Sequence, residues 1–156
     1  MTRATANERF SAAAAVLGLE PDVTRFPEDT RTAKQAAAAL RCELGQIIKS
    51  LVFACGGQAV LALTAGDRQV DTELFGLLNS AKIGKADASM VREATGFAIG
   101  GVPPFGHSSP LKCFIDQSIY RYETAWGAAG TPDTVFPIRT EKLAGLSGGR
   151  IAEFTQ

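Results

Sequence analysis

Residues 45–70, GQIIKSLVFACGGQAVLALTAGDRQV, hold two apolar runs separated by a pair of glycines. Both runs are rich in residues that favour strands, and Gly56-Gly57 supplies the positive φ angles that a two-residue hairpin turn needs. The strand-forming side chains are Ile47, Ile48, Leu51, Val52 and Phe53 before the turn, and Val60, Leu61 and Leu63 after it. The segment therefore predicts a β-hairpin, which ends at the turn Ala65-Gly66-Asp67.

Helical patterns with recognisable ends surround this hairpin. We predict helices over residues 5–17, 32–42, 71–80, 87–95 and 140–146, because apolar residues recur there at helical spacing or good helix formers dominate. Their ends carry capping residues: Thr5 with Glu8, Thr32 with Gln35, Asp71, Asp87, Thr140, and Gly96 as a C-cap. The helices are spread along the chain and are not gathered at one end.

Further strands are predicted between these helices. They cover residues 22–27, 82–86, 111–116, 122–128, 134–138 and 150–154. Strands and helices alternate without a regular βαβ rhythm, which indicates a mixed sheet. We expect the α/β class: a single compact domain over residues 1–156, with a mixed barrel-like β-sheet surrounded by helices.

The charge balance argues against broad electrostatic partners. Sixteen basic and sixteen acidic side chains cancel, so no overall field attracts the chain to nucleic acid or to an anionic membrane. We therefore expect neither DNA nor a membrane as a partner, and any RNA contact has to come from a local patch. No apolar run approaches the ~20 residues of a membrane span, and a cytoplasmic location is expected.

Metal and cofactor chemistry finds no support in the motifs. Cys42, Cys55 and Cys113 have no zinc-like spacing, and His107 is the only histidine. The nucleotide-binding glycine motifs and the G-x-S-x-G nucleophile elbow are absent. We expect reduced cysteines, no metal and no cofactor.

Residues 100–107, GGVPPFGH, form the most unusual loop of the chain. Glycine lets a ligand approach the backbone and proline fixes its shape. The N–H groups of Gly100 and Gly101 are therefore candidate donors to an oxyanion. The alternative is a tight loop with a purely structural role.

Two further features suggest a site. Lys49 interrupts the apolar run IIKSLVF, where it is either an edge residue that points to water or a cation at the mouth of a site. The segment GAAGTPD, residues 127–133, is rich in small residues and ends in Asp133; its alternative is an ordinary turn capped by an aspartate.

Together, QIIKSLVF, KIGKADASMVREATGFAIGGVPPFGH and GAAGTPDTVFPI resemble the YbaK/prolyl-tRNA-synthetase-associated editing domain family, from about Thr30 to the C-terminus. The resemblance implies a barrel-like α/β fold and a free-standing aminoacyl-tRNA deacylase. It assigns Lys49, Gly100 and Gly101 to catalysis. It assigns to substrate binding Val102, Pro103, Pro104, Gly106, His107, Gly130 and Asp133.

The implied reaction is hydrolysis of the ester between a wrong amino acid and tRNA, with tRNA for proline as the expected carrier and prolyl-tRNA synthetase as a possible partner beside the tRNA 3′ end. An activated ester needs placement and oxyanion stabilisation but no strong nucleophile. Alanine, cysteine, serine, threonine and 2-aminobutyrate all stay open as the amino acid removed. The alternative function is a non-catalytic module of the same fold that binds a synthetase, a tRNA end or an amino acid.

Overall fold

The predicted hairpin is present in the computed structural model, which describes residues 3–27, 30 and 32–156. Strands β2 (Ile48–Cys55) and β3 (Gln58–Ala65) pair in antiparallel fashion along their whole length. Gly56 and Gly57 have φ angles of 57° and 84°, which only a glycine pair adopts at little cost. Gly56-Gly57 therefore forms the two-residue turn that the sequence predicts.

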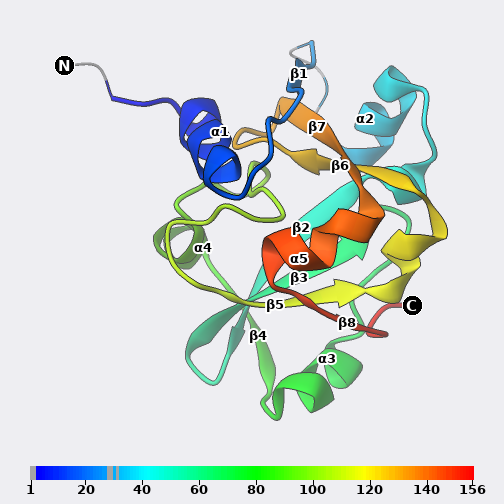
Figure 1. The fold of residues 1–156 in the computed structure, drawn as a ribbon. Helices are drawn as coiled ribbons and strands as arrows, with labels where there is room; N and C mark the ends of the chain where they lie inside the picture. The colour runs from blue at the N-terminus through cyan, green and yellow to red at the C-terminus, as the bar shows by residue number, and fades with distance from the viewer. Residues whose placement is uncertain (1–2, 28–29, 31) are drawn as a thin grey trace.

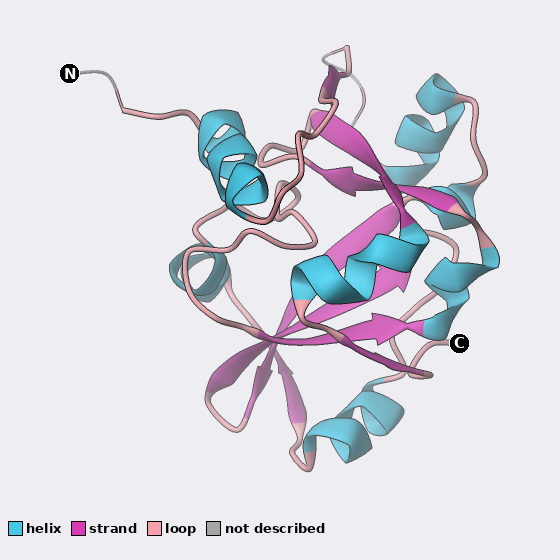
Figure 2. Ribbon diagram, viewed as in Figure 1, coloured by secondary structure: helices cyan, strands magenta, loops and turns pink. Residues whose placement is uncertain are grey.

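The strands form two sheets (Figures 1 and 2). In the five-stranded sheet, of order β4-β2-β3-β5-β8, the added strands are β4 (Ile83–Lys85), β5 (Lys112–Asp116) and β8 (Arg150–Ala152). The three-stranded sheet, of order β1-β7-β6, contains β1 (Thr24–Arg25), β6 (Thr124–Ala128) and β7 (Thr134–Arg139).

Among the described residues, a single bridge between Ile47 and Trp126 joins the two sheets. Beyond this bridge β2 and β6 have no pairing with each other, so the strands of the described residues do not close into a barrel. The expected mixed α/β fold is confirmed. Its barrel-like character consists of two sheets that meet at one point and leave a gap beside it.

Four of the expected helices begin at their predicted capping residues, Thr5, Thr32, Asp71 and Asp87. The helices are α1 (Ala6–Val16), α2 (Ala33–Leu40), α3 (Thr72–Asn79), α4 (Ala88–Thr95) and α5 (Leu143–Ser147). Both predicted capping boxes are formed, at Thr5 and at Thr32. The expected helix at 140–146 begins instead as a 3-10 turn, Thr140–Lys142, which continues into α5. In Figure 1, α3 lies at the bottom, whereas α1 and α2 lie at the top.

In the part of the chain that the structure describes, three buried clusters hold these layers together. The main cluster contains the rings of Phe10, Phe105 and Phe136, which contact one another in tilted and edge-to-face arrangements and attach α1 to the sheets. A second cluster surrounds Phe75 of α3 on the other face of the five-stranded sheet. A third, smaller cluster packs α2 against Ile47 and its neighbours. Because both faces of β2 are covered, apolar side chains occur on both of its sides.

Candidate active site

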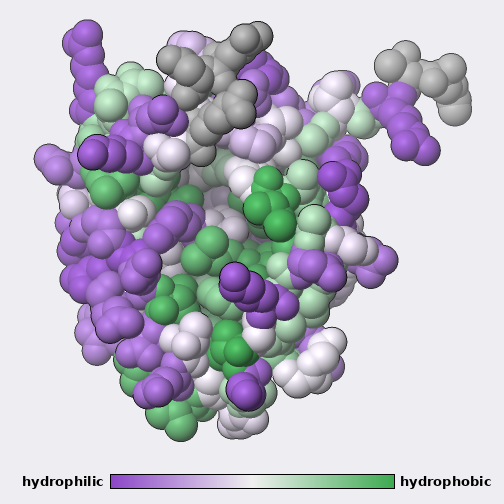
Figure 3. All heavy atoms as spheres, turned by 180° about the vertical axis from the view of Figure 1, so that it is seen from behind, coloured by the Kyte–Doolittle hydropathy of each residue, from purple (hydrophilic) through white to green (hydrophobic). Residues whose placement is uncertain are grey.

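A pocket of about 460 Å³ opens between the two sheets. Figure 3 shows an apolar hollow on the face opposite to the view of Figure 1. The wall consists of six consecutive residues of β2 (48–53), residues of α2 and α4, the loop after α4, and both strands of the β6–β7 hairpin. Its polar side chains are those of Thr30, Thr32, Lys49, Ser50 and Thr134. Among the described residues, no carboxylate, imidazole or thiol lines this pocket.

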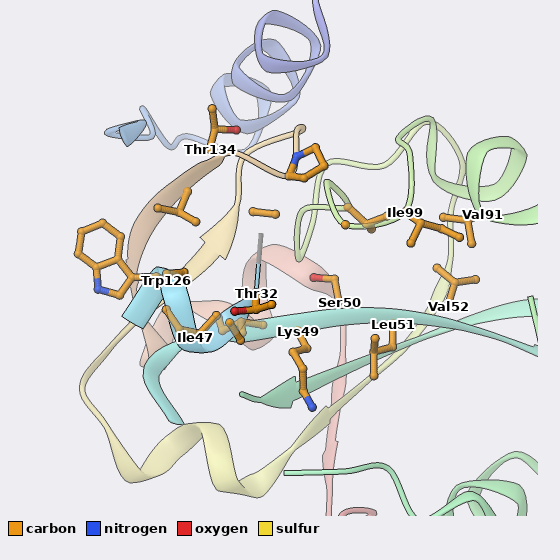
Figure 4. A pocket seen from close by; sticks show the side chains of 18 of the residues that line it. Thr32, Ile47, Lys49, Ser50, Leu51, Val52, Val91, Ile99, Trp126 and Thr134 are labelled. Atoms are coloured by element: carbon orange, nitrogen blue, oxygen red, sulfur yellow. The ribbon is translucent and has the colours of Figure 1, made fainter. Parts of the chain in front are cut away.

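Lys49 lies in the wall, but its ammonium group points away from the pocket. Figure 4 shows Lys49 and Leu51 on one side of β2 and Ser50 and Val52 on the other. The Nζ atom of Lys49 donates a hydrogen bond to the backbone oxygen of Arg68 at 2.5 Å. Burial lowers the pKa of Lys49, and the nearby carboxylate of Asp67 partly opposes this shift. Lys49 is therefore half-buried and hydrogen-bonded to the protein. The sequence suggested two alternatives, an edge residue that points to water or a cation at the mouth of a site, and Lys49 matches neither.

Ser50 projects from the pocket side of β2, opposite to the side from which Lys49 projects. Its Oγ atom is inaccessible to solvent and has no hydrogen-bond partner among the described residues. A buried hydroxyl without a partner is costly, so Ser50 Oγ is an unsatisfied polar group beside the pocket. Ser50 is not among the site residues predicted from the sequence, although it alternates with Lys49 and Leu51 and so shares a side of β2 with Ile48 and Val52.

The loop after α4 reaches the pocket with its first residues only. Ile99, Gly100 and Val102 line the wall, and Gly100 is exposed with a φ of 88°. The N–H of Gly101 donates to the oxygen of Ala98 at 3.0 Å. The expectation that Gly101 offers its N–H to an oxyanion is therefore wrong for this conformation, because that N–H closes a tight turn.

The remaining loop residues hold the loop in place. Pro103 and Pro104 are buried, and the Nε2 atom of His107 donates to the oxygen of Pro103 at 2.7 Å. Burial lowers the pKa of His107, partly offset by this hydrogen bond. Gly106, at a φ of 81°, faces Ala13 of α1. These four residues, to which the resemblance assigns substrate binding, lie outside the pocket wall.

Some residues of the turn between β6 and β7 line the pocket, whereas others contact the surrounding protein. Pro132 and Thr134 line the pocket. Asp133 points elsewhere: it pairs with Arg25 at 2.5 Å and accepts a hydrogen bond from Thr131. The side-chain hydrogen bond from Thr131, followed by that from Arg25, lowers the pKa of Asp133. Asp133 thus lies outside the pocket wall, and its carboxylate is engaged by Arg25 and Thr131.

Gly130 also lies outside the pocket wall and packs on the surrounding protein. It adopts a φ of 112°, and a Cβ at this position would lie 2.7 Å from the backbone oxygen of Ala6. The turn therefore packs directly on the start of α1. Asn7 reinforces this contact through hydrogen bonds to the oxygen of Ala129 and to the hydroxyl of Thr134, both at 2.9 Å.

The described residues contain no group of three or more His, Cys, Asp or Glu side chains arranged to hold a metal ion. In the same part of the chain, no helix has the length and apolar character needed to cross a membrane. The three cysteines are free. Burial raises the pKa of Cys113 to about 12, so this thiol is neutral at neutral pH.

Known proteins share both the sequence and the fold. The aminoacyl-tRNA editing domain family matches residues 27–146. The uncharacterised protein YwhH of Bacillus subtilis is 32% identical over 133 residues, which are 85% of each chain. The proline–tRNA ligase of Bacillus licheniformis is 33% identical over 104 residues, 66% of this chain but only 18% of the ligase.

A solved structure gives the same picture at full length. The crystal structure of a candidate trans-editing enzyme for prolyl-tRNA synthetase has a TM-score of 0.93 and 37% identity, and the match covers 99% of both chains. The matched family segment contains β2, α4, the loop after it and the β6–β7 turn, which together build the pocket. The chain therefore belongs to the aminoacyl-tRNA editing domain family.

Proposed function

We propose that this protein hydrolyses the ester of mischarged tRNA in trans and thereby removes a small, uncharged amino acid, with tRNA for proline as the carrier. Two observations support the proposal: the chain belongs to an editing family, and a solved structure that matches its whole length carries a trans-editing name. We further propose that residues 1–156 act as one deacylase domain, with the tRNA 3′ end as its ligand and prolyl-tRNA synthetase as a partner.

The pocket chemistry is the observation that carries the choice of substrate. Its side chains are apolar apart from four hydroxyls and Lys49, whose ammonium group points away. A charged amino acid side chain placed there would lose its hydration without gaining a partner, which is costly. The volume of about 460 Å³ exceeds that of a small amino acid, so it leaves room for part of the terminal ribose as well.

The reaction asks little of the protein beyond placement. Water attacks the ester carbonyl carbon, the bond to the ribose oxygen breaks, and the free amino acid and uncharged tRNA leave. We propose that Gly100 and Val102 contact the substrate, while Gly101, Pro103, Pro104, Gly106 and His107 fix their loop. Gly130 and Asp133 are proposed to fix the opposite wall. Lys49 is proposed as a positioning residue that holds β2 against the turn at Arg68.

The test is a deacylation assay with purified protein and tRNA for proline. The tRNA is charged separately with alanine, cysteine, serine, threonine, 2-aminobutyrate and proline, and loss of the ester is followed over time. We expect at least one small, uncharged amino acid to be released faster than its spontaneous rate, and lysine or glutamate esters on the same tRNA to persist. Binding of every charged tRNA without release of any amino acid would instead establish the non-catalytic module.

A further inference from the structure

Strand β2 has an open edge inside the pocket. On one side it pairs with β3 over its whole length, but on the other side β4 pairs only with Phe53–Cys55. At the other end, Ile47 forms the bridge to Trp126. Between these points, residues 48–52 have no strand partner on this side among the described residues. The gap is about five residues long, or roughly 16 Å.

The register shows which backbone groups point into this gap. The two-residue turn is closed by the pair Cys55 and Gln58, and hydrogen-bonded and non-hydrogen-bonded pairs alternate from there. Lys49 and Leu51 therefore use their N–H and C=O groups toward β3, whereas Ser50 and Val52 direct theirs to the open side. The same alternation agrees with the ladder to β4, in which Ala54 is the central residue.

The pocket lining supports this assignment. A strand covered on both edges presents only every second residue to a pocket on one face. In β2 all six residues from Ile48 to Phe53 line the pocket, because the edge itself forms part of the wall. On the far side, Trp126 and Ala128 of β6 line the same gap. The pocket is thus the space between two strands that part after the Ile47–Trp126 bridge.

These backbone groups need a partner. Polar backbone atoms in a largely apolar pocket are costly when they are unpaired. The buried and unpartnered Oγ atom of Ser50 adds a second unsatisfied group at the same point. The Gly101 N–H, in contrast, is occupied by Ala98. The open edge of β2 therefore offers a substrate polar groups that the Gly101 N–H does not.

We infer that the aminoacyl group of the substrate binds as a one-residue strand on the open edge of β2. The backbone N–H of Ser50 donates to the acyl carbonyl oxygen and to the oxyanion that forms there, and the Ser50 C=O accepts from the substrate ammonium group. This is the arrangement of a hydrogen-bonded antiparallel pair. It recognises the atoms common to all amino acids and leaves selectivity to the apolar wall. The inference rests on the proposed function.

The first experiment removes a single N–H. The α-hydroxy acid analogue of serine at position 50 replaces the Ser50 N–H by oxygen and keeps its side chain. We expect kcat for deacylation to fall about 100-fold, as for a lost oxyanion donor, with an unchanged melting temperature. The matched control is the α-hydroxy acid analogue of valine at position 60, which lies outside the pocket wall and whose N–H pairs with Phe53 of β2. We expect it to lower the melting temperature and to retain kcat.

The second experiment reads binding without turnover. The ¹⁵N-labelled protein is titrated with 3′-alanylamino-3′-deoxyadenosine, in which an amide replaces the ester. We expect the largest amide shifts at Ser50 and Val52. The inference is overturned if the position-50 ester variant has the wild-type kcat, or if the amide shifts are confined to residues 98–104. In either case, deacylation by the wild-type protein still upholds the proposed function. If the wild type hydrolyses no ester and does not bind the analogue, the proposed function and the inference both fail.

Discussion

The backbone of Gly101 packs directly on that of Gly130: a Cβ on Gly101 would lie 2.7 Å from the Gly130 carbonyl oxygen. Gly101→Ala therefore has to push two walls of the pocket apart. We expect a loss of about 1–3 kcal/mol in unfolding free energy, as for other overpacked sites, and a lower deacylation rate. Chemical denaturation and turnover assays measure the two effects.

Gly145→Ala is the matched control for this change. Gly145 lies in α5, and a Cβ there meets no atom within 4 Å. Alanine in a helix is favoured over glycine by roughly 0.5–1 kcal/mol, so this variant should be at least as stable as the wild type and equally active. If Gly101→Ala and Gly145→Ala have the same unfolding free energy and the same deacylation rate, the backbone contact between Gly101 and Gly130 can relax without loss of stability or activity.

Lys49→Met tests the hydrogen bond to Arg68. Methionine keeps the apolar stem but removes the ammonium group that holds the turn at Arg68 against β2. If Lys49 positions the β2 edge, kcat should fall about tenfold or more while the melting temperature changes little, and Lys49→Arg should restore part of the activity. Circular dichroism melts and single-turnover assays provide the two readouts.

Lys112→Met is the control for loss of a lysine from the same sheet. Lys112 is exposed on β5, above the ring of Phe114 and outside the pocket wall. We expect wild-type turnover from this variant. Equal activity of Lys49→Met and Lys112→Met would exclude the positioning role of Lys49.

Local features of the fold were predictable, because they are encoded in a few neighbouring residues. The glycine pair of the hairpin and the capping boxes at Thr5 and Thr32 are examples. The gap between β2 and β6 was not predictable, since it depends on how far strands distant in sequence remain paired. The helix at 140–146 began as a 3-10 turn for a similar reason, because Thr140 is held by the backbone of Tyr122.

The segments that line the pocket were more predictable than the directions of their side chains. Lys49 lies in the pocket wall, but the sequence did not show which side of β2 it occupies. Both faces of β2 are covered by apolar clusters, so Leu51 and Val52 look alike in sequence although they face opposite ways. The direction of the Asp133 carboxylate was not predictable for another reason: its partner, Arg25, lies 108 residues earlier in the chain.

The cysteines should be dispensable for the reaction. Cys113 is buried with a pKa of about 12, and burial also raises the pKa of Cys42 and Cys55. None of the three lines the pocket. We expect each Cys→Ser variant to retain the wild-type kcat, with some loss of stability for the buried Cys113. Complete loss of turnover in a folded single variant would contradict hydrolysis by substrate placement.

Asp116 should make the stability of the protein depend on pH. This buried carboxylate accepts hydrogen bonds from the N–H of Phe154, the hydroxyl of Thr155 and both the N–H and the hydroxyl of Ser118. Burial by itself would raise its pKa, but these hydrogen bonds outweigh that effect and hold the pKa of Asp116 below the ordinary 3.8. The carboxylate thereby connects β5 to the C-terminal residues.

A depressed carboxyl pKa stabilises the folded state above the unfolded pKa, and this contribution is lost as the pH falls through the folded pKa. Asp116→Asn should therefore cost about 2 kcal/mol or more at pH 7, because donors lose a charged acceptor. The difference in unfolding free energy between wild type and variant should stay constant down to about pH 5 and become smaller below pH 3.8. Urea titrations between pH 3 and 7 measure it, with the exposed Glu153→Gln as control. If this difference in unfolding free energy does not change between pH 3 and 7, the charge on Asp116 does not contribute to the attachment of β5 to the C-terminal residues.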